Sequence, residues 1–204
     1  MLHTQSQDKL LVYPSKDLDD LQSVYRLTYD TYLRRGICKP NPQKTLIHNP
    51  QLDQSPDTTI LVARQKGEVV GTISLTKGYQ KEDIYNYQSF ASQLSLEPTE
   101  GGPFFSGWRL AIKGDGPSSR YLALQLILKG IQHLLQQDLT YGYMCFREEH
   151  LRFYKRILPE GYVVGRSAKQ TNDIDTELCM WKCYLSEERY TFLHRMVLRM
   201  SQRS

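Results

Sequence analysis

The chain has 204 residues, of which 40% are hydrophobic, 11% aromatic and 24% charged. This length is typical of one large domain, which we place at residues 1–204, and the composition excludes a disordered tail, a collagen-like repeat and a disulfide scaffold. The formal net charge is only +4 and the basic residues form no dense cluster, so we expect no nucleic-acid partner.

The four cysteines and five histidines form no metal-ligating motif. The four cysteines, Cys38 included, contain no CxxC pair, which predicts no metal. Cys145, Cys179 and Cys183 lie in apolar runs, which predicts that these three are reduced, buried thiols. The first residues lack the apolar core of a secretory signal, and the densest apolar stretch, 122–128, is far shorter than the ~20 residues of a membrane helix. We therefore expect a cytoplasmic protein without a membrane span.

The chain begins with signals for a short strand and a long helix. Residues 9–13 are strand-like, and Ser15 or Asp17 can cap a helix that runs to Arg35 and ends at Gly36. The predicted apolar face of this helix has residues spaced three and four apart, namely Leu18, Leu21, Tyr25, Thr28 and Tyr32.

A proline-rich stretch after this helix indicates a long loop, and the clearest hairpin of the sequence follows it. The β-branched and apolar runs at 58–63 and 69–75, joined by a turn with Gly67, predict two antiparallel strands. Residues 84–98 are compatible with a helix that ends at Pro98.

The second half of the chain predicts alternating strands and helices. A strand at 107–113 leads through a turn at 114–119 into a helix at 120–137, which is apolar on most of its circumference. A strand at 141–146 and a short helix at 148–158 follow.

Two further strands are predicted at 161–165 and 176–185, and an amphipathic helix occupies 186–204. Its apolar row is formed by Tyr190, Leu193, Val197 and Met200, and its basic row by Arg195, Arg199 and Arg203. This order of elements predicts an α/β fold in which helices flank a mixed, partly parallel central sheet.

Three segments together resemble the acyltransferases of the GNAT superfamily, and are most similar to its N-acyl amino acid synthases and acyl-homoserine lactone synthases. They are YRLTYDTYLRRGI at 25–37, ILVARQKGEVVGTISL at 60–75 and WRLAIKGDGPSSRYLALQLILKGI at 108–131, followed by FYKRILPEGY at 153–162. The resemblance implies a three-layer GNAT-like fold. It also implies transfer of a long acyl group from an acyl carrier protein or coenzyme A thioester to the amine of a small acceptor such as an amino acid.

The third segment implies the site of the thioester donor. A glycine-containing turn at a helix N-terminus presents free N–H groups to a phosphate, and Arg120 adds a positive charge. The alternative is an ordinary strand-to-helix turn capped by Ser118 or Ser119, and Asp115 is an unfavourable charge beside a phosphate. The implied donor-binding residues are Leu110, Ala111, Ile112, Lys113, Gly114, Gly116, Ser118, Ser119, Arg120 and Tyr121.

Two residues are implied at the reacting groups. Tyr154 matches the tyrosine that protonates the leaving sulfur in the superfamily, although a core aromatic is its alternative role. Ser106 stands three residues before Arg109, where the branch has a glutamate, and Ser74 stands where the homoserine lactone enzymes usually carry an arginine. These departures argue against homoserine lactone synthesis and leave the general base open, with water as a possible relay.

The acceptor and acyl pockets have five candidate residues: Arg26, Tyr29, Arg34, Trp108 and Arg109. A solvated helix face is the alternative for the first two arginines, and core packing for the two aromatic residues. A charged Arg109 in a central strand must either pair with an acid or point into a cavity, so structural pairing and acceptor recognition both remain open.

The basic row of the last helix could be a solvated face or could dock the acidic surface of an acyl carrier protein. An alternative function is a GNAT-like module that has lost its base and only binds an acyl carrier or a protein partner, which the serines at 106 and 74 favour. An RNA-linked activity is supported by the net charge alone.

Overall fold

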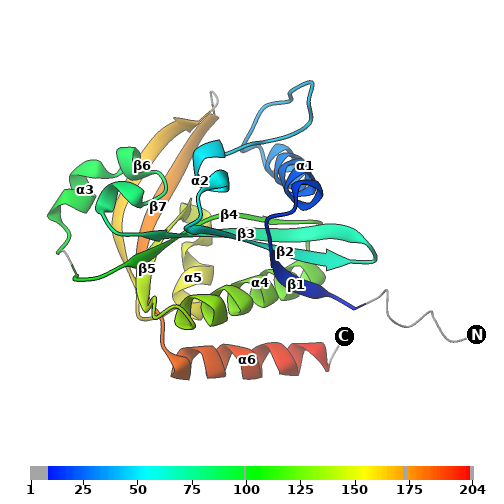
Figure 1. Cartoon of the computed structure of the whole chain (residues 1–204). Coiled ribbons are helices and arrows are strands. Elements are labelled where there is room, and N and C mark those ends of the chain that lie inside the picture. Colours follow the sequence, from blue (N-terminus) through cyan, green and yellow to red (C-terminus); the bar gives the residue numbers. More distant parts are fainter. Residues whose placement is uncertain (1–8, 99, 172–173, 203–204) are drawn as a thin grey trace, which may run out of the picture. The chain divides into compact units, whose positions relative to one another are not determined.

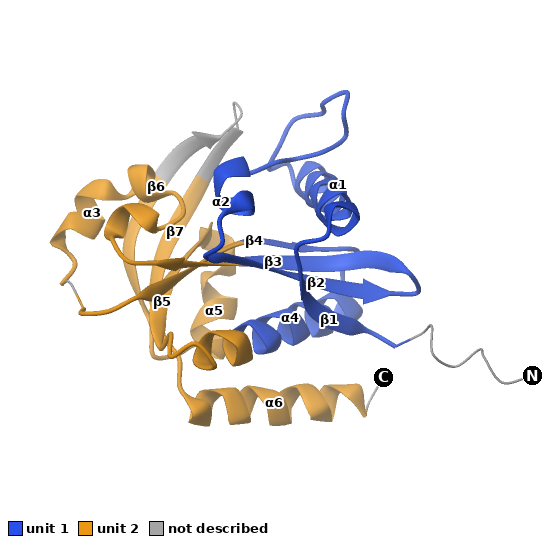
Figure 2. Ribbon diagram, viewed as in Figure 1, with its two compact units in different colours: residues 1–74, 109–130 blue, residues 75–108, 131–204 orange. Residues whose placement is uncertain are grey.

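The computed structural model describes residues 9–98, 100–171 and 174–202. The strands follow one another in the sheet in the order β1-β2-β3-β4-β5-β7-β6, and helices accompany them (Figure 1), so the predicted α/β fold with a mixed sheet is confirmed. The chain divides into two compact units, residues 1–74 with 109–130 and residues 75–108 with 131–204 (Figure 2). The single domain expected from the sequence stays a prediction.

The first unit contains the N-terminal elements, the strands β1 and β2 and parts of β3 and β4. In Figure 2 the helices α1 and α2 lie on one face of its strands and α4 lies on the other. Its elements are β1 (Leu11–Ser15), α1 (Leu18–Arg34), α2 (Pro50–Gln54), β2 (Thr58–Gln65), the first part of β3 (Glu68–Gly78), the end of β4 (Phe104–Ile112) and the first part of α4 (Pro117–Leu135).

Helix α1 begins where the sequence predicts, and its buried face overlaps the predicted one at Thr28, while Leu21 and Tyr25 pack at its edge. The Asp17 side chain caps it by accepting from the N–H of Asp19 at 2.8 Å. Leu18 is 74% exposed, which contradicts the predicted apolar row. The buried row instead passes through Val24, because this residue packs against Ile60 and Val62 of β2. It is formed by Asp20, Val24, Leu27, Thr28, Tyr29 and Thr31.

The proline-rich stretch is not only a loop, because it contains the helix α2. The Asn49 side chain accepts from the N–H of Leu52 at 3.1 Å, and Pro50 occupies the first turn. Proline suits this position, since its missing N–H would have no partner there and its φ is already helical. The sequence analysis missed this short helix.

The hairpin of β2 and β3 is confirmed, with a two-residue turn at Lys66 and Gly67, whose φ angles are +52° and +80°. On the face toward α4, Gly71 permits a close approach of helix and strand. A Cβ at this position would lie 2.8 Å from Leu126 Cδ1. Helix α4 begins at Pro117, three residues before the predicted start, because proline is favoured in the first helical turn.

The second unit contains the strands β5, β6 and β7 and parts of β3 and β4. Strand β4 begins at Phe104, earlier than predicted, and pairs in parallel with β5, whereas β7 pairs antiparallel with both β5 and β6. Besides the remaining parts of β3, β4 and α4, the unit contains η1 (Lys81–Asp83), η2 (Tyr87–Ser89), α3 (Ala91–Leu96), β5 (Tyr141–Arg147), η3 (Glu148–His150), α5 (Leu151–Ile157), β6 (Tyr162–Thr171), β7 (Ile174–Tyr184) and α6 (Glu187–Ser201).

One hydrophobic cluster joins the short helices between β3 and β4 to this part of the sheet. Phe104 of β4 contacts the ring of Tyr143 of β5 edge-on, with 5.5 Å between ring centroids. The predicted helix within 84–98 is thus partly confirmed, as α3 with two 3₁₀ turns before it. The buried members of the cluster are Ile84, Phe90, Leu94, Phe104, Tyr141, Tyr143 and Met180.

Arg189 of helix α6 connects this helix to α5. Helix α6 starts at the predicted place, where the Ser186 side chain caps it, and Leu193 and Val197 are its buried residues. The Arg189 guanidinium donates to the carbonyls of Arg156 and Ile157, both at 2.6 Å. These are carbonyls at the C-terminus of α5, which lack partners within that helix.

The prediction of buried free thiols is correct for Cys179 and Cys183, but Cys145 is only half-buried; Cys38, for which no burial was predicted, is also a buried free thiol. It lies beside Asn86, whose amide donates to Sγ at 3.5 Å. Among the described residues, no group of three or more His, Cys, Asp and Glu side chains could hold a metal ion. No helix in this part of the chain has the length and apolar character needed to cross a membrane.

The close contact of β4 and β5 gives a stability prediction. A Cβ on Gly142 would lie 2.1 Å from the carbonyl oxygen of Phe105, so Gly142→Ala should lower the free energy of unfolding by about 1–3 kcal/mol or more. Gly101→Ala is the control, since a Cβ there meets nothing within 4 Å. Urea denaturation measures both variants. Equal stability of the two would show that β4 and β5 are not this close.

Candidate active site

The turn between β4 and α4 presents the N-terminus of a 19-residue helix. Gly114 and Gly116 have φ angles of +77° and +94°, a conformation that favours glycine. The ladder between β3 and β4 ends with the N–H of Lys113 on the carbonyl of Val70, and the helix ladder begins with Arg120 N–H on Gly116. The N–H groups at the start of α4 therefore point out of the helix, where its dipole favours an anion.

The unfavourable charge at Asp115 is offset by α1. Arg34 Nε lies 3.5 Å from the Asp115 carboxylate, and Arg35 Nη2 lies 4.0 Å from it. Arg34 also donates to the carbonyl of Gly114 at 3.4 Å. The turn therefore combines helix N–H groups with nearby cations, and its acid already has positive partners.

The other predicted donor residues continue on both sides of this turn. Leu110, Ala111 and Ile112 belong to β4, where the carbonyl of Ile112 accepts from Thr31 Oγ1 of α1 at 3.2 Å. Arg120 is exposed on the first turns of α4. The hydroxyl of Tyr121 accepts from the Gln125 amide at 2.6 Å.

Arg109 is buried and forms an ion pair with Asp53 of α2. Its Nη2 lies 2.7 Å from Asp53 Oδ1, and its Nη1 donates to Oδ2 at 2.9 Å. Nε and Nη2 also donate to Ser74 Oγ of β3, at 3.0 and 2.7 Å. Of the two roles that the sequence left open, the geometry of Arg109 thus fits structural pairing. The sequence analysis missed its partner Asp53.

The ion pair contributes to the pKa shifts of two neighbouring side chains. Tyr25 of α1 donates to Asp53 Oδ2 at 2.9 Å, and burial, this hydrogen bond and the charge of Asp53 raise the pKa of Tyr25 to about 12. Burial and the positive charge of Arg109 lower the pKa of His48 to about 4. Both side chains are therefore neutral at pH 7.

The left-handed backbone at Arg109, with φ of +51°, changes the direction of its side chain. Trp108 donates to Thr76 Oγ1 at 3.0 Å, while Arg109 donates to Ser74, two residues along β3 on the same face. In a regular strand, consecutive side chains would point to opposite faces. The distortion lets two neighbouring residues of β4 both bond with the polar face of β3.

Ser106 lies on the same face of β4 as Trp108. Its Oγ accepts from the N–H of Tyr85 at 2.9 Å, and the Tyr85 ring stacks on Trp108 with 5.1 Å between centroids. A serine hydroxyl that no base activates is a poor proton acceptor at neutral pH. At the position where the resemblance implies a glutamate, this chain therefore has a serine that forms a structural hydrogen bond.

Tyr154 of α5 is only 7% exposed. Its ring stacks on Phe146 of β5, with 4.1 Å between centroids and 20° between planes, and it contacts Phe153 edge-on. The ring is therefore held in one position, as both its core role and its proposed acid role require.

The remaining predicted pocket residues lie in two different environments. Tyr29 and Trp108 are buried, and the Tyr29 hydroxyl accepts from the N–H of Asn41 at 3.2 Å. Arg26 and Arg34 are exposed on α1. None of these four lines the cavity next to Asp53.

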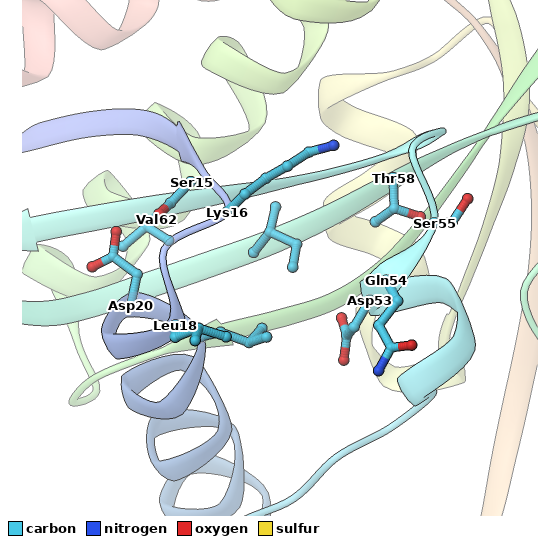
Figure 3. Close-up of a pocket in the computed structure, with 11 residues that line it drawn as sticks. Ser15, Lys16, Leu18, Asp20, Asp53, Gln54, Ser55, Thr58 and Val62 are labelled. Atoms are coloured by element: carbon cyan, nitrogen blue, oxygen red, sulfur yellow. The ribbon is translucent and has the colours of Figure 1, made fainter.

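That cavity has a volume of about 270 Å³ and lies at the N-terminus of α1 (Figure 3). Leu18 of α1 and Asp53 of α2 point toward one another across it, and Ile60 of β2 contributes to its apolar wall. Lys16 and Asp20 bring charges of opposite sign to its lining. The Asp20 carboxylate pairs with Arg64.

A second buried ionic network, also missed by the sequence analysis, lies in the second unit. Lys182 of β7 is 1% exposed and pairs with Glu100, with Glu97 3.6 Å away. Burial opposes its charge, but the hydrogen bond of Glu100 outweighs this effect and the pKa of Lys182 is raised. Four tyrosine rings have their centroids 5.8–5.9 Å from its Nζ: Tyr141, Tyr143, Tyr162 and Tyr184.

Comparison with known proteins gives one family. The family model of the N-acyl amino acid synthase FeeM matches residues 23–168. No curated protein sequence matches the chain significantly.

Solved structures share the fold at low sequence identity. FeeM from uncultured soil microbes is 16% identical with a TM-score of 0.69, and the match covers 88% of this chain and 92% of that chain. BjaI, a CoA-dependent acyl-homoserine lactone synthase solved with SAM and isopentyl-CoA, is 14% identical with a TM-score of 0.73, over 93% of this chain and 90% of that one. A GNAT-family acetyltransferase from Desulfovibrio desulfuricans is 10% identical with a TM-score of 0.55, and the match covers 87% of this chain and 100% of that chain.

The ion pair of Arg109 gives a second stability prediction. Asp53→Ala leaves a buried guanidinium without its acid and should lower the free energy of unfolding by about 3–5 kcal/mol. Glu68→Gln breaks the exposed pair with Lys113 and should leave stability nearly unchanged. Urea denaturation at neutral pH compares the two. A loss from Asp53→Ala no larger than that from Glu68→Gln would mean that Arg109 is not held by this pair.

Proposed function

We propose how this chain, which belongs to the family of the N-acyl amino acid synthase FeeM and is an N-acyltransferase, binds its two substrates and moves the proton. The donor is a thioester on a phosphopantetheine arm, and the acceptor is a small amine such as an amino acid. The observation that supports this best is the turn at Gly114–Ser119, where the start of α4, Lys113 and Arg120 can hold the phosphate and Asp115 is neutralised by α1.

The reaction joins the amine nitrogen to the thioester carbonyl carbon. The N–C bond forms, the C–S bond breaks, and the sulfur takes a proton from the hydroxyl of Tyr154. The Tyr154 phenolate then takes a proton back from water, so the proton that the amine loses balances the one that the sulfur gains. The amine gives up its proton to water, because Ser106 is no base and Asp53 is already paired with Arg109 and Tyr25. A thioester is an activated acyl donor, so holding the two reactants in attack geometry can supply much of the rate.

The acceptor fits the charges of the 270 Å³ cavity beside Asp53. Lys16 can bind the carboxylate of an amino acid, and Leu18 and Ile60 offer an apolar surface to its side chain. Arg109, for which the sequence left acceptor recognition open, would then act indirectly by fixing Asp53 at the cavity wall.

Two donors carry a phosphopantetheine arm, namely acyl-coenzyme A and acyl carrier protein. Arg195 and Arg199 are exposed on α6 and could dock the acidic surface of a carrier protein, whereas Arg203 of the same row lies outside the described residues. The cytoplasmic location stays a prediction.

A second candidate function is a binding module that has lost its catalytic base. The hydrogen bond between Tyr85 and Ser106 favours it, because a structural role now occupies the position of the glutamate. Such a module would bind the donor without releasing its thiol.

Release of free thiol from acyl-coenzyme A and acyl carrier protein, with and without amino acids, separates the two functions. We expect thiol release that requires both donor and amine and is equal to the amide formed. A rise in melting temperature with the donor, without thiol release, would support the binding module instead.

Tyr154→Phe tests the acid. The substitution keeps the ring stacked on Phe146 but removes the proton donor, so kcat should fall about 100-fold while the Kd of the donor is unchanged. Tyr190→Phe on α6 is the matched control and should retain full activity. An unchanged kcat in Tyr154→Phe would remove this residue from the chemistry and leave it a core aromatic.

A further inference from the structure

The exposed side of helix α6 combines arginines with large apolar side chains. Arg195 and Arg199 are exposed, Phe192 is 53% exposed and Leu198 is 48% exposed. Residues three or four positions apart are neighbours on the surface of a helix, so Arg195 adjoins the other three. We call these four residues the α6 surface.

The positive charge of the α6 surface is not neutralised by the rest of the helix. Residues 189–204 contain four arginines and no Asp or Glu. The two acids of the helix, Glu187 and Glu188, lie in its first turn, where the helix dipole favours a negative charge. In the part of the chain that the structure describes, neither Arg195 nor Arg199 forms an ion pair. Both guanidinium groups are therefore available to an anionic partner.

Phe192 is held at the surface by a fixed cation. The Arg189 guanidinium lies 4.6 Å from the centroid of the Phe192 ring, and such a contact is attractive even at an exposed site. The guanidinium is itself fixed, because it donates to the carbonyls of Arg156 and Ile157, both at 2.6 Å. The exposed ring is thus positioned before any partner binds, which lowers the entropic cost of binding.

A partner of the α6 surface must accept cations and apolar groups side by side. The boundary between the headgroups and the acyl chains of an anionic bilayer does so, since arginines stay at the phosphates while phenylalanine and leucine enter the apolar layer. An acidic protein surface would pair with the two arginines, but its carboxylates would lose water against Phe192 and Leu198. The α6 surface therefore fits an anionic lipid bilayer better than an acidic protein.

We propose that the α6 surface binds membranes that contain anionic lipids. Helix α6 then lies on the membrane without crossing it, and Arg195 and Arg199 contact lipid headgroups rather than a carrier protein. The benefit to the enzyme rests on the proposed function. An amino acid that carries a long acyl chain is an amphiphile, and an enzyme on the membrane releases it where it partitions.

Cosedimentation of the full chain with phospholipid vesicles tests this binding without any chemistry. We expect vesicles of phosphatidylcholine mixed with phosphatidylglycerol to bind the chain at least about tenfold more tightly than vesicles of phosphatidylcholine alone. Added salt should weaken binding to the mixed vesicles, because it screens the arginines. Equal binding to both kinds of vesicle, or binding to acyl carrier protein but to neither kind of vesicle, would overturn the proposal.

Arg195→Gln/Arg199→Gln tests the two charges and should weaken binding to the mixed vesicles about tenfold. The control is Lys9→Gln/Lys44→Gln, which removes the same charge from two exposed lysines of the first unit and should bind as the native chain does. An equal loss in the two double variants would mean that net charge alone attracts the chain, and would contradict a lipid site on α6.

Phe192→Ser tests the apolar contact without changing any charge, and should also weaken binding to the mixed vesicles about tenfold. Leu96→Ser on α3 is the matched control, because Leu96 is 85% exposed and lies outside the α6 surface. It should retain native binding. Full binding in Phe192→Ser would show that the ring does not enter the membrane. Melting temperatures without vesicles verify that each variant is folded, as exposed positions lead us to expect.

Failure here can be told apart from failure of the proposed function. Amine-dependent thiol release by a chain that binds no vesicles would remove the membrane site and keep the acyltransferase. Selective binding to the mixed vesicles with no thiol release from any donor would keep the membrane site and remove the proposed catalytic roles.

Discussion

A guanidinium that is taken out of water in the middle of a strand must be neutralised where it lies, and this constraint organises the first unit. Arg109 meets it through Asp53, which is brought to β4 by the short helix α2, and through the hydroxyl of Ser74. Because α2 must deliver a carboxylate, the chain after α1 cannot be a free loop. The same carboxylate orders Tyr25 of α1 and borders the cavity proposed for the acceptor.

The chemistry that the site can perform depends on which of its polar side chains already have partners within the protein. Asp53 and Asp115 both have arginine partners, and Ser106 accepts from a backbone N–H, so none of the three is a ready proton acceptor. What the residues offer instead is the turn proposed for a phosphate, a fixed tyrosine ring and a small cavity whose lining is mostly apolar. This distribution suits a reaction in which the substrate is activated beforehand and the protein mainly positions it.

Local signals in the sequence were sufficient for the hairpin, the glycine turn and the helix that follows it, since each depends on residues close together in the chain. The partner of Arg109 could not be predicted in this way, because Asp53 is 56 positions away and lies in a polar stretch without periodicity. The left-handed backbone at Arg109 also interrupts the alternation of side chains between the two faces of β4. No regular sequence pattern therefore indicates the direction of the Arg109 side chain. The Asn-Pro pair at 49–50 is the one local sign of α2 that the sequence contains.

Lys182 shows how a buried charge can respond to heat. Its ammonium has left water for two glutamates and a ring of tyrosines, and the cost of that dehydration decreases as temperature rises, because the hydration of ions is entropically unfavourable. Glu97 and Glu100 belong to the segment between α3 and β4. The attachment of this segment to β7 therefore becomes relatively more favourable on warming.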